Sequence, residues 1–481
     1  MSKETPQIQG TLASFFERRF QLNANKTTVR TELWAGVATF LSMAYILAVN
    51  PSLLALTGMN ASGVFVATVL AAVVGTLIMA FHANYPFALA PGMGLNAYLV
   101  YSIVFGMGYS WQFALFAVFL EGLIFIVLTL TKAREAIFDA IPQGLRIGVG
   151  AGIGLFLAFI GLQNARLIVH NEATLVAFTT FDAATIHTSG ICGILTLVGF
   201  VLIAVMSRYK IRGSILLGVV ATWILGMICQ ATGVYRVDVA SNYFSLYPTF
   251  TSSTSDLFSG FREVFLAAFD VSNWTKNGSE ISGWRMLFSF NVFVVVFALF
   301  FVDFFDTLGT VVALAVKGKL YDSEGKLPRV RNVLLADAVA TTAGAALGTS
   351  TTTTFLESST GVAQGGKTGL TALTVAALFL LSIVFSPVFL AVPSFATSAA
   401  LLYVGFLMTS TLAELDFDDL TEAAPAFVAC AVIPLAYSIS EGIALGYLSW
   451  VAINIFSGGR KKISPLAYGL TALFIAKYVL L

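Results

Sequence analysis

The chain has 481 residues, of which 58% are hydrophobic and only 11% are charged, whereas soluble domains usually carry about 25% charged residues. This shortfall predicts a surface that faces lipid, and the formal net charge of +1 offers no basic field for nucleic acid. The three cysteines lie in apolar stretches without metal-ligand spacing, so we expect neither a metal site nor a cofactor.

Candidate membrane spans fill most of the chain after a polar N-terminal segment, 1–30, which lacks the apolar core of a cleavable signal peptide. A spanning helix needs about 20 largely apolar residues. The segment 423–456 is too long for one ordinary span and contains Pro434, so it crosses either once or twice. The candidate spans lie at 33–49, 63–81, 87–105, 112–130, 144–162, 188–206, 213–232, 287–302, 333–348, 352–364, 370–391, 394–411, 423–456 and 463–481.

Loop charges set the predicted orientation, because cytoplasmic loops carry an excess of Lys and Arg. We therefore expect a multi-pass protein of the cell membrane with a cytoplasmic N-terminus and an extracytoplasmic loop at 233–285. If 423–456 crosses twice, Arg460–Lys462 is also cytoplasmic and 463–481 is an extra helix; if it crosses once, this cluster lies outside. The other basic clusters follow the fourth, sixth and eighth spans and include Lys132, Arg134, Arg208, Lys210, Arg212, Lys317, Lys319, Lys326 and Arg329.

The loop at 233–285 divides the chain into halves of similar length. If each half has an odd number of spans, about seven apiece, the second half is inverted relative to the first. This is the sequence condition for an inverted-repeat transporter, whose site is formed by interrupted helices near the middle of the membrane. The sequence thus predicts an all-α polytopic transporter.

Two interrupted segments occupy matching positions in the halves. The third span contains Pro91 and Gly92, which break a helix, and the tenth contains the hydroxyl-rich run 349–360. Unwound backbone at membrane depth is tolerated only where protein or water covers it. We expect each segment to begin extended and then to start a half-helix, so that two helix N-termini with free N–H groups face each other.

The eighth span places two aspartates, Asp303 and Asp306, inside an apolar run. At this spacing they share one helix face. A charge at mid-bilayer costs at least about 2.5–3.5 kcal/mol, so such residues normally face a cavity and mark a pathway or a proton relay. The structural alternative is a carboxylate bonded to a helix end for Asp303, and a cap on backbone amides for Asp306.

Weaker signals come from Glu121 and from the glycines of 148–154. Glu121 opens an apolar run, and structural and functional interpretations carry equal weight. The glycine run has no strand before it, so it predicts close helix packing rather than a nucleotide loop. No nucleophile–histidine–acid set appears, and we expect no enzymatic activity.

At these residues the chain resembles the azaguanine-type purine permeases, a branch of the nucleobase–cation symporters related to the uracil and xanthine permeases. The resemblance runs from about residue 12 to the C-terminus. The matching motifs are LAPGMGLNAY at Leu89–Tyr98, VDFFDTLGT at Val302–Thr310, GTSTTTTFLESSTGV at Gly348–Val362 and SEGIALG at Ser440–Gly446, and the stretch Gly36–Tyr45 also matches.

The resemblance implies about fourteen helices in a seven-plus-seven inverted repeat with a core and a gate domain. The core domain binds substrate, and the gate domain forms a scaffold and the contacts of a homodimer. We expect the core to move against the gate, with the glycines of 148–154 as the sliding surface. The predicted parts are the N-terminus (1–30), the core (31–131 and 286–392), the gate (142–232 and 393–481) and the outer loop (233–285).

The resemblance also implies proton-coupled uptake of adenine, guanine or hypoxanthine. Guanine offers two adjacent N–H donors to one carboxylate and hypoxanthine offers one, whereas adenine offers an acceptor there, so we favour guanine and hypoxanthine. For proton coupling, Asp303 is the leading candidate and Asp306 and Glu357 are alternates. The predicted substrate-binding residues are Asn96, Gly94, Asp303, Glu357, Thr353 and Ser358.

Two other transport functions remain open. Paired half-helix N-termini would suit sulfate or bicarbonate, but Asp303, Asp306 and Glu357 would repel an anion. Carboxylate and hydroxyl oxygens could also bind Na⁺, which leaves sodium-coupled nucleobase transport as a rival to proton symport. In each case the partners are a small solute, a coupling ion and the lipid bilayer.

Overall fold

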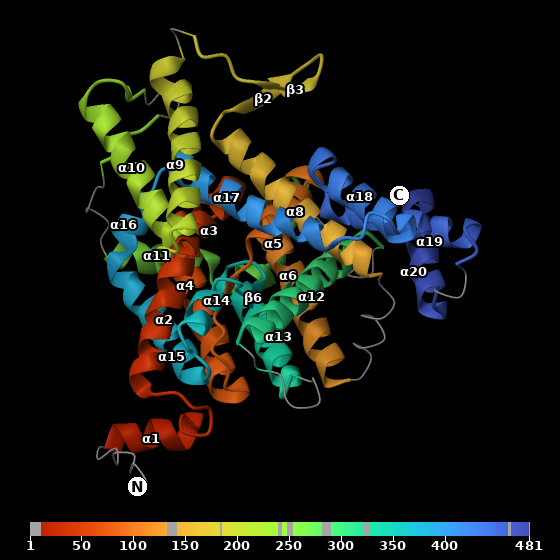
Figure 1. Cartoon of the computed structure of the whole chain (residues 1–481). Helices are drawn as coiled ribbons and strands as arrows, with labels where there is room; N and C mark the ends of the chain where they lie inside the picture. The colour runs from red at the N-terminus through yellow and green to blue at the C-terminus, as the bar shows by residue number, and fades with distance from the viewer. Residues whose placement is uncertain are drawn as a thin grey trace.

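The computed structural model describes residues 11–131, 142–182, 185–238, 243–247, 254–280, 290–318, 320, 327–459 and 463–480. Within these ranges, nine helices are long and apolar enough to cross a membrane. The prediction of an all-α polytopic membrane protein is therefore confirmed (Figure 1). Among the basic clusters used for orientation, Lys132, Arg134, Lys319, Lys326 and Arg460–Lys462 lie outside the described ranges.

Helices account for the candidate spans in both halves. In the first half they are α1 (Thr11–Phe20), α2 (Val29–Met43), α3 (Ile46–Leu54), α4 (Ala61–Ile78), α5 (Met93–Ala97), α6 (Trp111–Leu130), α8 (Gln143–Asn164), α9 (Ile191–Arg208) and α10 (Ser214–Ala231). In the second half they are α12 (Phe290–Gly318), α13 (Val330–Leu347), α14 (Ser358–Ala363), α15 (Gly369–Ser382), α16 (Ser386–Leu390), α17 (Ser394–Thr409), α18 (Leu420–Leu435), α19 (Ile439–Phe456) and α20 (Pro465–Leu480). Between the halves, α11 (Thr254–Val264) lies in the predicted outer loop.

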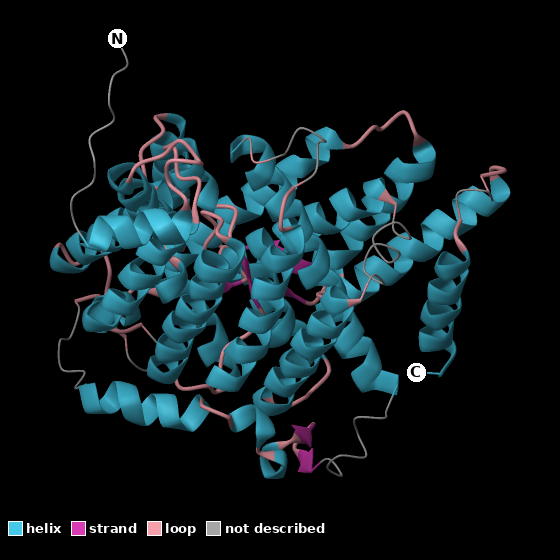
Figure 2. Cartoon of the chain, turned by 90° about the horizontal axis from the view of Figure 1, so that it is seen from below, coloured by secondary structure: helices cyan, strands magenta, loops and turns pink. Residues whose placement is uncertain are grey.

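Three short strand pairs complete the described fold. The pair β1 (Leu89–Pro91) and β6 (Thr352–Thr354) is enclosed by helices (Figure 2). The other two are local hairpins, formed by β2 (Ile168–Asn171) with β3 (Leu175–Phe178) and by β4 (Thr275–Lys276) with β5 (Ser279–Glu280).

The helix α4 shows how local sequence sets these elements. Its first turn is capped by Asn60, whose Oδ1 accepts the backbone N–H groups of Ser62 at 3.1 Å and Gly63 at 3.3 Å. The outer loop packs against this same end, because α11 lies so close that a Cβ on Gly63 would be 2.2 Å from the carbonyl oxygen of Gly260. The helix α11 of this loop is therefore packed closely against α4.

The segment 423–456 forms two helices, α18 and α19, which pack against each other. The break falls at Tyr437, whose φ of 53° is left-handed and which follows Pro434 in the last turn of α18. Two helices here leave α20 as an additional C-terminal helix. The segment is therefore two helices, of which α19 is long enough to cross a membrane and α18 is a shorter apolar helix.

The glycines of 148–154 confirm close packing, and the neighbours found for them are α17 and α18 rather than helices of the predicted core. A Cβ on Gly148 would lie 2.4 Å from the carbonyl oxygen of Ala426 in α18, and a Cβ on Gly154 would lie 2.7 Å from that of Gly405 in α17. Both partners belong to the predicted gate itself. The glycines therefore join α8 to its own scaffold, because small residues let helix backbones approach.

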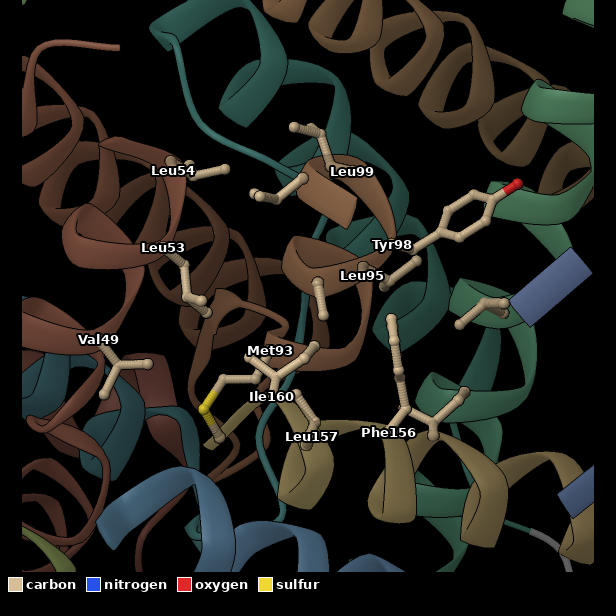
Figure 3. Close-up of a cluster of buried hydrophobic side chains, with 14 of the residues drawn as sticks. Val49, Leu53, Leu54, Met93, Leu95, Tyr98, Leu99, Phe156, Leu157 and Ile160 are labelled. Carbon is tan, nitrogen blue, oxygen red and sulfur yellow. The ribbon is translucent and has the colours of Figure 1, made fainter. Parts of the chain in front are cut away.

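A different face of α8 meets α5, and larger apolar side chains form that contact (Figure 3). Beyond α5, the same buried cluster continues into α3, so α5 lies between a helix of the predicted core and a helix of the predicted gate. The labelled members of the cluster are Val49, Leu53, Leu54, Met93, Leu95, Tyr98, Leu99, Phe156, Leu157 and Ile160.

Candidate functional site

The two interrupted segments meet in an antiparallel strand pair. β1 pairs with β6 so that Leu89 lies opposite Thr354 and Pro91 lies opposite Thr352, and both strands are fully buried. Pro91 has no N–H to offer a helix, and consecutive β-branched threonines favour extended backbone. Pairing also satisfies backbone groups that lipid could not. The predicted extended start of both segments is confirmed.

Each strand leads into a short helix, as predicted. Gly92 precedes α5, where its N–H donates to the carbonyl oxygen of Thr351 at 3.0 Å and its own carbonyl accepts the N–H of Asn96 at 2.9 Å. Glu357 occupies the corresponding position before α14. Half-helix starts on both segments therefore flank the strand pair.

Asn96 lies at the centre of a buried amide and hydroxyl network. Its Nδ2 donates to Oδ1 of Asn50 at 2.6 Å, and its Oδ1 accepts the hydroxyl of Ser350. Asn50 in turn donates to Thr68 at 2.6 Å and to Thr349 at 2.9 Å. Asn96 therefore joins α3 and α5 to the residues before β6, and Asn50 is a member that the sequence interpretation missed.

Glu357 is half-buried and is bonded to a tyrosine from the first span. The hydroxyl of Tyr45 donates to Oε1 of Glu357 at 2.6 Å. Tyr45 is fully buried at the break between α2 and α3. It ends the stretch Gly36–Tyr45 that matched the purine permeases, so the sequence carried a signal for it.

The two aspartates of α12 contact different neighbours. Asp306 is half-buried, and its Oδ2 accepts the hydroxyl of Thr353 at 3.4 Å. Asp303 is fully buried, and its Oδ1 lies 3.4 Å from the hydroxyl of Thr307. That hydroxyl is closer to Asp337, at 2.6 Å. Because it has one proton, it donates mainly to Asp337 and leaves Asp303 weakly satisfied.

Asp337 of α13 is a carboxylate that the sequence interpretation missed, as it missed Asn50. Its Oδ1 accepts the N–H of Thr354 at 2.8 Å and the hydroxyl of the same residue at 3.1 Å. It therefore holds the end of β6 against α13 and α12. The signal was present, since Asp337 is a lone carboxylate within the candidate span at 333–348.

The remaining predicted residues lie around the same strand pair. Gly94 lies where α5 comes close to α8, because a Cβ there would be 2.6 Å from Cγ2 of Ile153. Thr353 lies opposite Ala90 in the strand register. The hydroxyl of Ser358 accepts the N–H of Ala88 at 3.0 Å, which ties α14 to the segment before β1.

The structure brings all the predicted site residues to one region, where α12 and the two interrupted segments meet. Carboxylates, hydroxyls and a carboxamide gather there in an otherwise apolar bundle. Among the described residues, no group of three or more His, Cys, Asp or Glu could hold a metal ion. The arrangement suits hydrogen bonding to a small polar solute and the binding of protons.

Comparisons with known proteins agree with a transport role. Residues 30–445 match the model of the Permease family. An adenine permease of Escherichia coli is 38% identical over 477 residues, which cover 99% of this chain and 98% of the permease. A guanine/hypoxanthine permease of Bacillus subtilis is 39% identical over 466 residues, which cover 96% of this chain and 100% of the permease.

Solved structures of low sequence identity share the fold. The transmembrane domain of a cyanobacterial bicarbonate transporter superposes with a TM-score of 0.59 at 14% identity, over 86% of this chain and 96% of that domain. At this identity the likeness concerns the fold alone.

Proposed function

Because the chain belongs to the Permease family, we propose that it imports purine nucleobases by proton symport. The observation that carries this proposal is the set of carboxylates beside the β1–β6 pair, namely Asp303, Asp306 and Glu357. Carboxylates accept the N–H groups of a neutral base and can carry protons, whereas they would repel sulfate or bicarbonate. The shared fold with a bicarbonate transporter therefore does not extend to its substrate.

Accessibility divides the predicted binding residues into two groups. Glu357 and Asp306 are half-buried, whereas Asp303 and Asn96 are fully buried. We assign Glu357 and Asp306 to direct contact with the base. Asn96 supports α5, whose Gly94 sets the distance to α8, and Thr353 and Ser358 hold the backbone of the interrupted segments.

Guanine and hypoxanthine are the favoured substrates. Guanine presents N1–H and a 2-amino group side by side, which match the two oxygens of a carboxylate such as Glu357. Hypoxanthine presents N1–H alone, and adenine presents an unprotonated nitrogen that would oppose a carboxylate lone pair. The related permeases include one named for adenine and one named for guanine and hypoxanthine, so the preference rests on this chemical argument.

Transport would proceed by movement of the predicted core against the predicted gate. In this proposal the N-terminus lies in the cytoplasm, and the gate makes the contacts of a homodimer. The α5–α8 contact supports this proposal because it joins the two predicted domains beside the site. Its apolar side chains impose no directional hydrogen bonds that would resist sliding.

Binding to purified protein tests the substrate assignment. We expect radiolabelled hypoxanthine to bind, guanine to compete better than adenine, and sulfate to have no effect. Replacing Glu357 by Gln removes a charge-assisted acceptor worth about 1.5–3 kcal/mol, so affinity should fall roughly 10- to 150-fold. The control is Glu414→Gln, because Glu414 is an exposed carboxylate. Sulfate binding without purine binding would contradict the proposal.

A further inference from the structure

A pair of carboxyl groups lies behind the proposed substrate site. Glu121 of α6 and Asp303 of α12 are both 0% exposed. Helices α6 and α12 pack against each other, and the two carboxyl groups lie close enough to interact. As carboxylates, however, Oε1 of Glu121 and Oδ2 of Asp303 have no hydrogen-bond partner. Each side chain therefore has a buried oxygen without a donor, and the other oxygen of Asp303 has only the weak contact with Thr307.

One proton resolves this arrangement. Two carboxylates cannot bond to each other, because both groups are acceptors only. A single proton between Oε1 and Oδ2 makes an O–H···O⁻ bond, satisfies both atoms and reduces the charge of the pair from two negative charges to one. Bonds of this charge-assisted type are strong, and close carboxylates in other proteins share a proton for the same reason.

The surroundings of the pair favour a bound proton. The other charged groups that act on Glu121 and Asp303 within the described residues are the acidic side chains of Asp337 and Asp306. Asp337 accepts three hydrogen bonds. With acidic groups beside it, a pair that shares one proton carries less repulsion than a pair of two carboxylates.

The pair is also connected to the interrupted segments. The second oxygen of Glu121, Oε2, accepts the hydroxyl of Thr351 at 2.9 Å. The carbonyl of Thr351 receives the N–H of Gly92 at the start of α5. On the other side, Asp303 lies one helical turn from Asp306, which bonds Thr353 of β6. A change in the protonation of the pair would therefore act on both segments that form the site.

We propose that the coupling proton is held between Glu121 and Asp303, with Glu121 as the residue that positions the proton on Asp303. This inference rests on the proposed proton symport and adds its site and a second residue. Glu357 is a weaker candidate because its carboxylate already has a donor in Tyr45. Asp306 is weaker because it is half-buried and takes its bond from Thr353.

The test is the pH dependence of hypoxanthine affinity in purified protein. One linked proton makes the apparent Kd rise by up to about tenfold per pH unit on the alkaline side. In Glu121→Gln, the amide donates permanently to Asp303 and removes the shared proton. We expect a flat pH profile, loss of pH-driven accumulation in proteoliposomes, and hypoxanthine counterflow that still exceeds that of protein-free liposomes.

Two further variants keep the test interpretable. Glu422→Gln removes a partly buried carboxylate of α18 that bonds Gly144 and Trp450 rather than the pair, and should keep the wild-type pH profile. Glu121→Asp keeps a titratable group and should shift the profile rather than flatten it; this variant also serves if Glu121→Gln does not fold.

The outcomes separate the inference from the function on which it rests. A wild-type pH profile and full accumulation in Glu121→Gln, or an unshifted profile in Glu121→Asp, would overturn the shared-proton site while leaving proton symport intact. Wild-type protein that accumulates hypoxanthine on a sodium gradient, indifferent to pH and to an uncoupler, would instead overturn the proposed coupling itself.

Discussion

Replacing Gly94 by Ala should impair transport through a contact with α8. The added Cβ would lie 2.6 Å from Cγ2 of Ile153, whereas ordinary van der Waals contacts of this kind begin at 3.4 Å. Relieving this overlap requires α5 and α8 to separate, and overpacking of a buried contact typically costs about 1–3 kcal/mol. If overpacking raises the free energy of this conformation and of no other in the transport cycle, the population of this conformation should fall roughly 5- to 150-fold.

A second substitution tests the cause. Ile153→Leu moves the branch away from Cβ at nearly constant volume, so alone it should cost less than about 1.5 kcal/mol. We expect Gly94→Ala to slow initial hypoxanthine uptake into proteoliposomes, and the double variant to recover most of the rate. A Gly94→Ala defect that Ile153→Leu leaves unchanged would refute the packing explanation and favour direct contact between Gly94 and the base.

Further substitutions follow from the contacts. Asn50→Ala leaves the Asn96 amide without its acceptor and should lower stability by about 1–3 kcal/mol in thermal unfolding; an unchanged melting temperature would contradict the network. Gly152→Leu should lower yield and melting temperature, because a Cβ there would be 3.0 Å from Cα of Cys430, whereas Gly150→Leu should be tolerated because nothing lies within 4 Å. Tyr45→Phe should alter hypoxanthine affinity more than unfolding temperature, and the reverse pattern would make this tyrosine purely structural.

Local signals in the sequence were sufficient to find the interrupted segments. Pro91 and Gly92 cannot continue a helix, and the hydroxyl run at 349–360 is too polar for a lipid-facing one. The prediction of extended backbone followed by a half-helix is confirmed on both segments because it depends only on neighbouring residues. Span positions follow from apolar runs for the same reason.

The partners of the site residues could not be predicted in the same way. Tyr45 and Glu357 are 312 positions apart, and Asn50 and Thr349 are 299 apart, so neither pair has a local pattern. A carboxylate inside an apolar span is a local signal, and it marks Asp337 as well as Asp303.

The glycine run shows a related limit. Glycines at 148–154 predict that some backbone comes close, and this is confirmed, but composition does not identify the neighbouring helix. The neighbours are α17 and α18, and the contact with α5 is made instead by larger side chains that include Ile153. Identifying the helices that face this run required the three-dimensional arrangement.

Uptake by purified protein in proteoliposomes tests the central claim most directly. The liposomes are loaded at alkaline pH and diluted into acidic medium that contains radiolabelled hypoxanthine, with equal sodium on both sides. Proton symport of a purine base predicts transient accumulation above the external concentration, its abolition by an uncoupler, and inhibition by excess unlabelled guanine. Failure to accumulate hypoxanthine, guanine or adenine under any imposed gradient, together with uptake of bicarbonate or sulfate, would contradict the account.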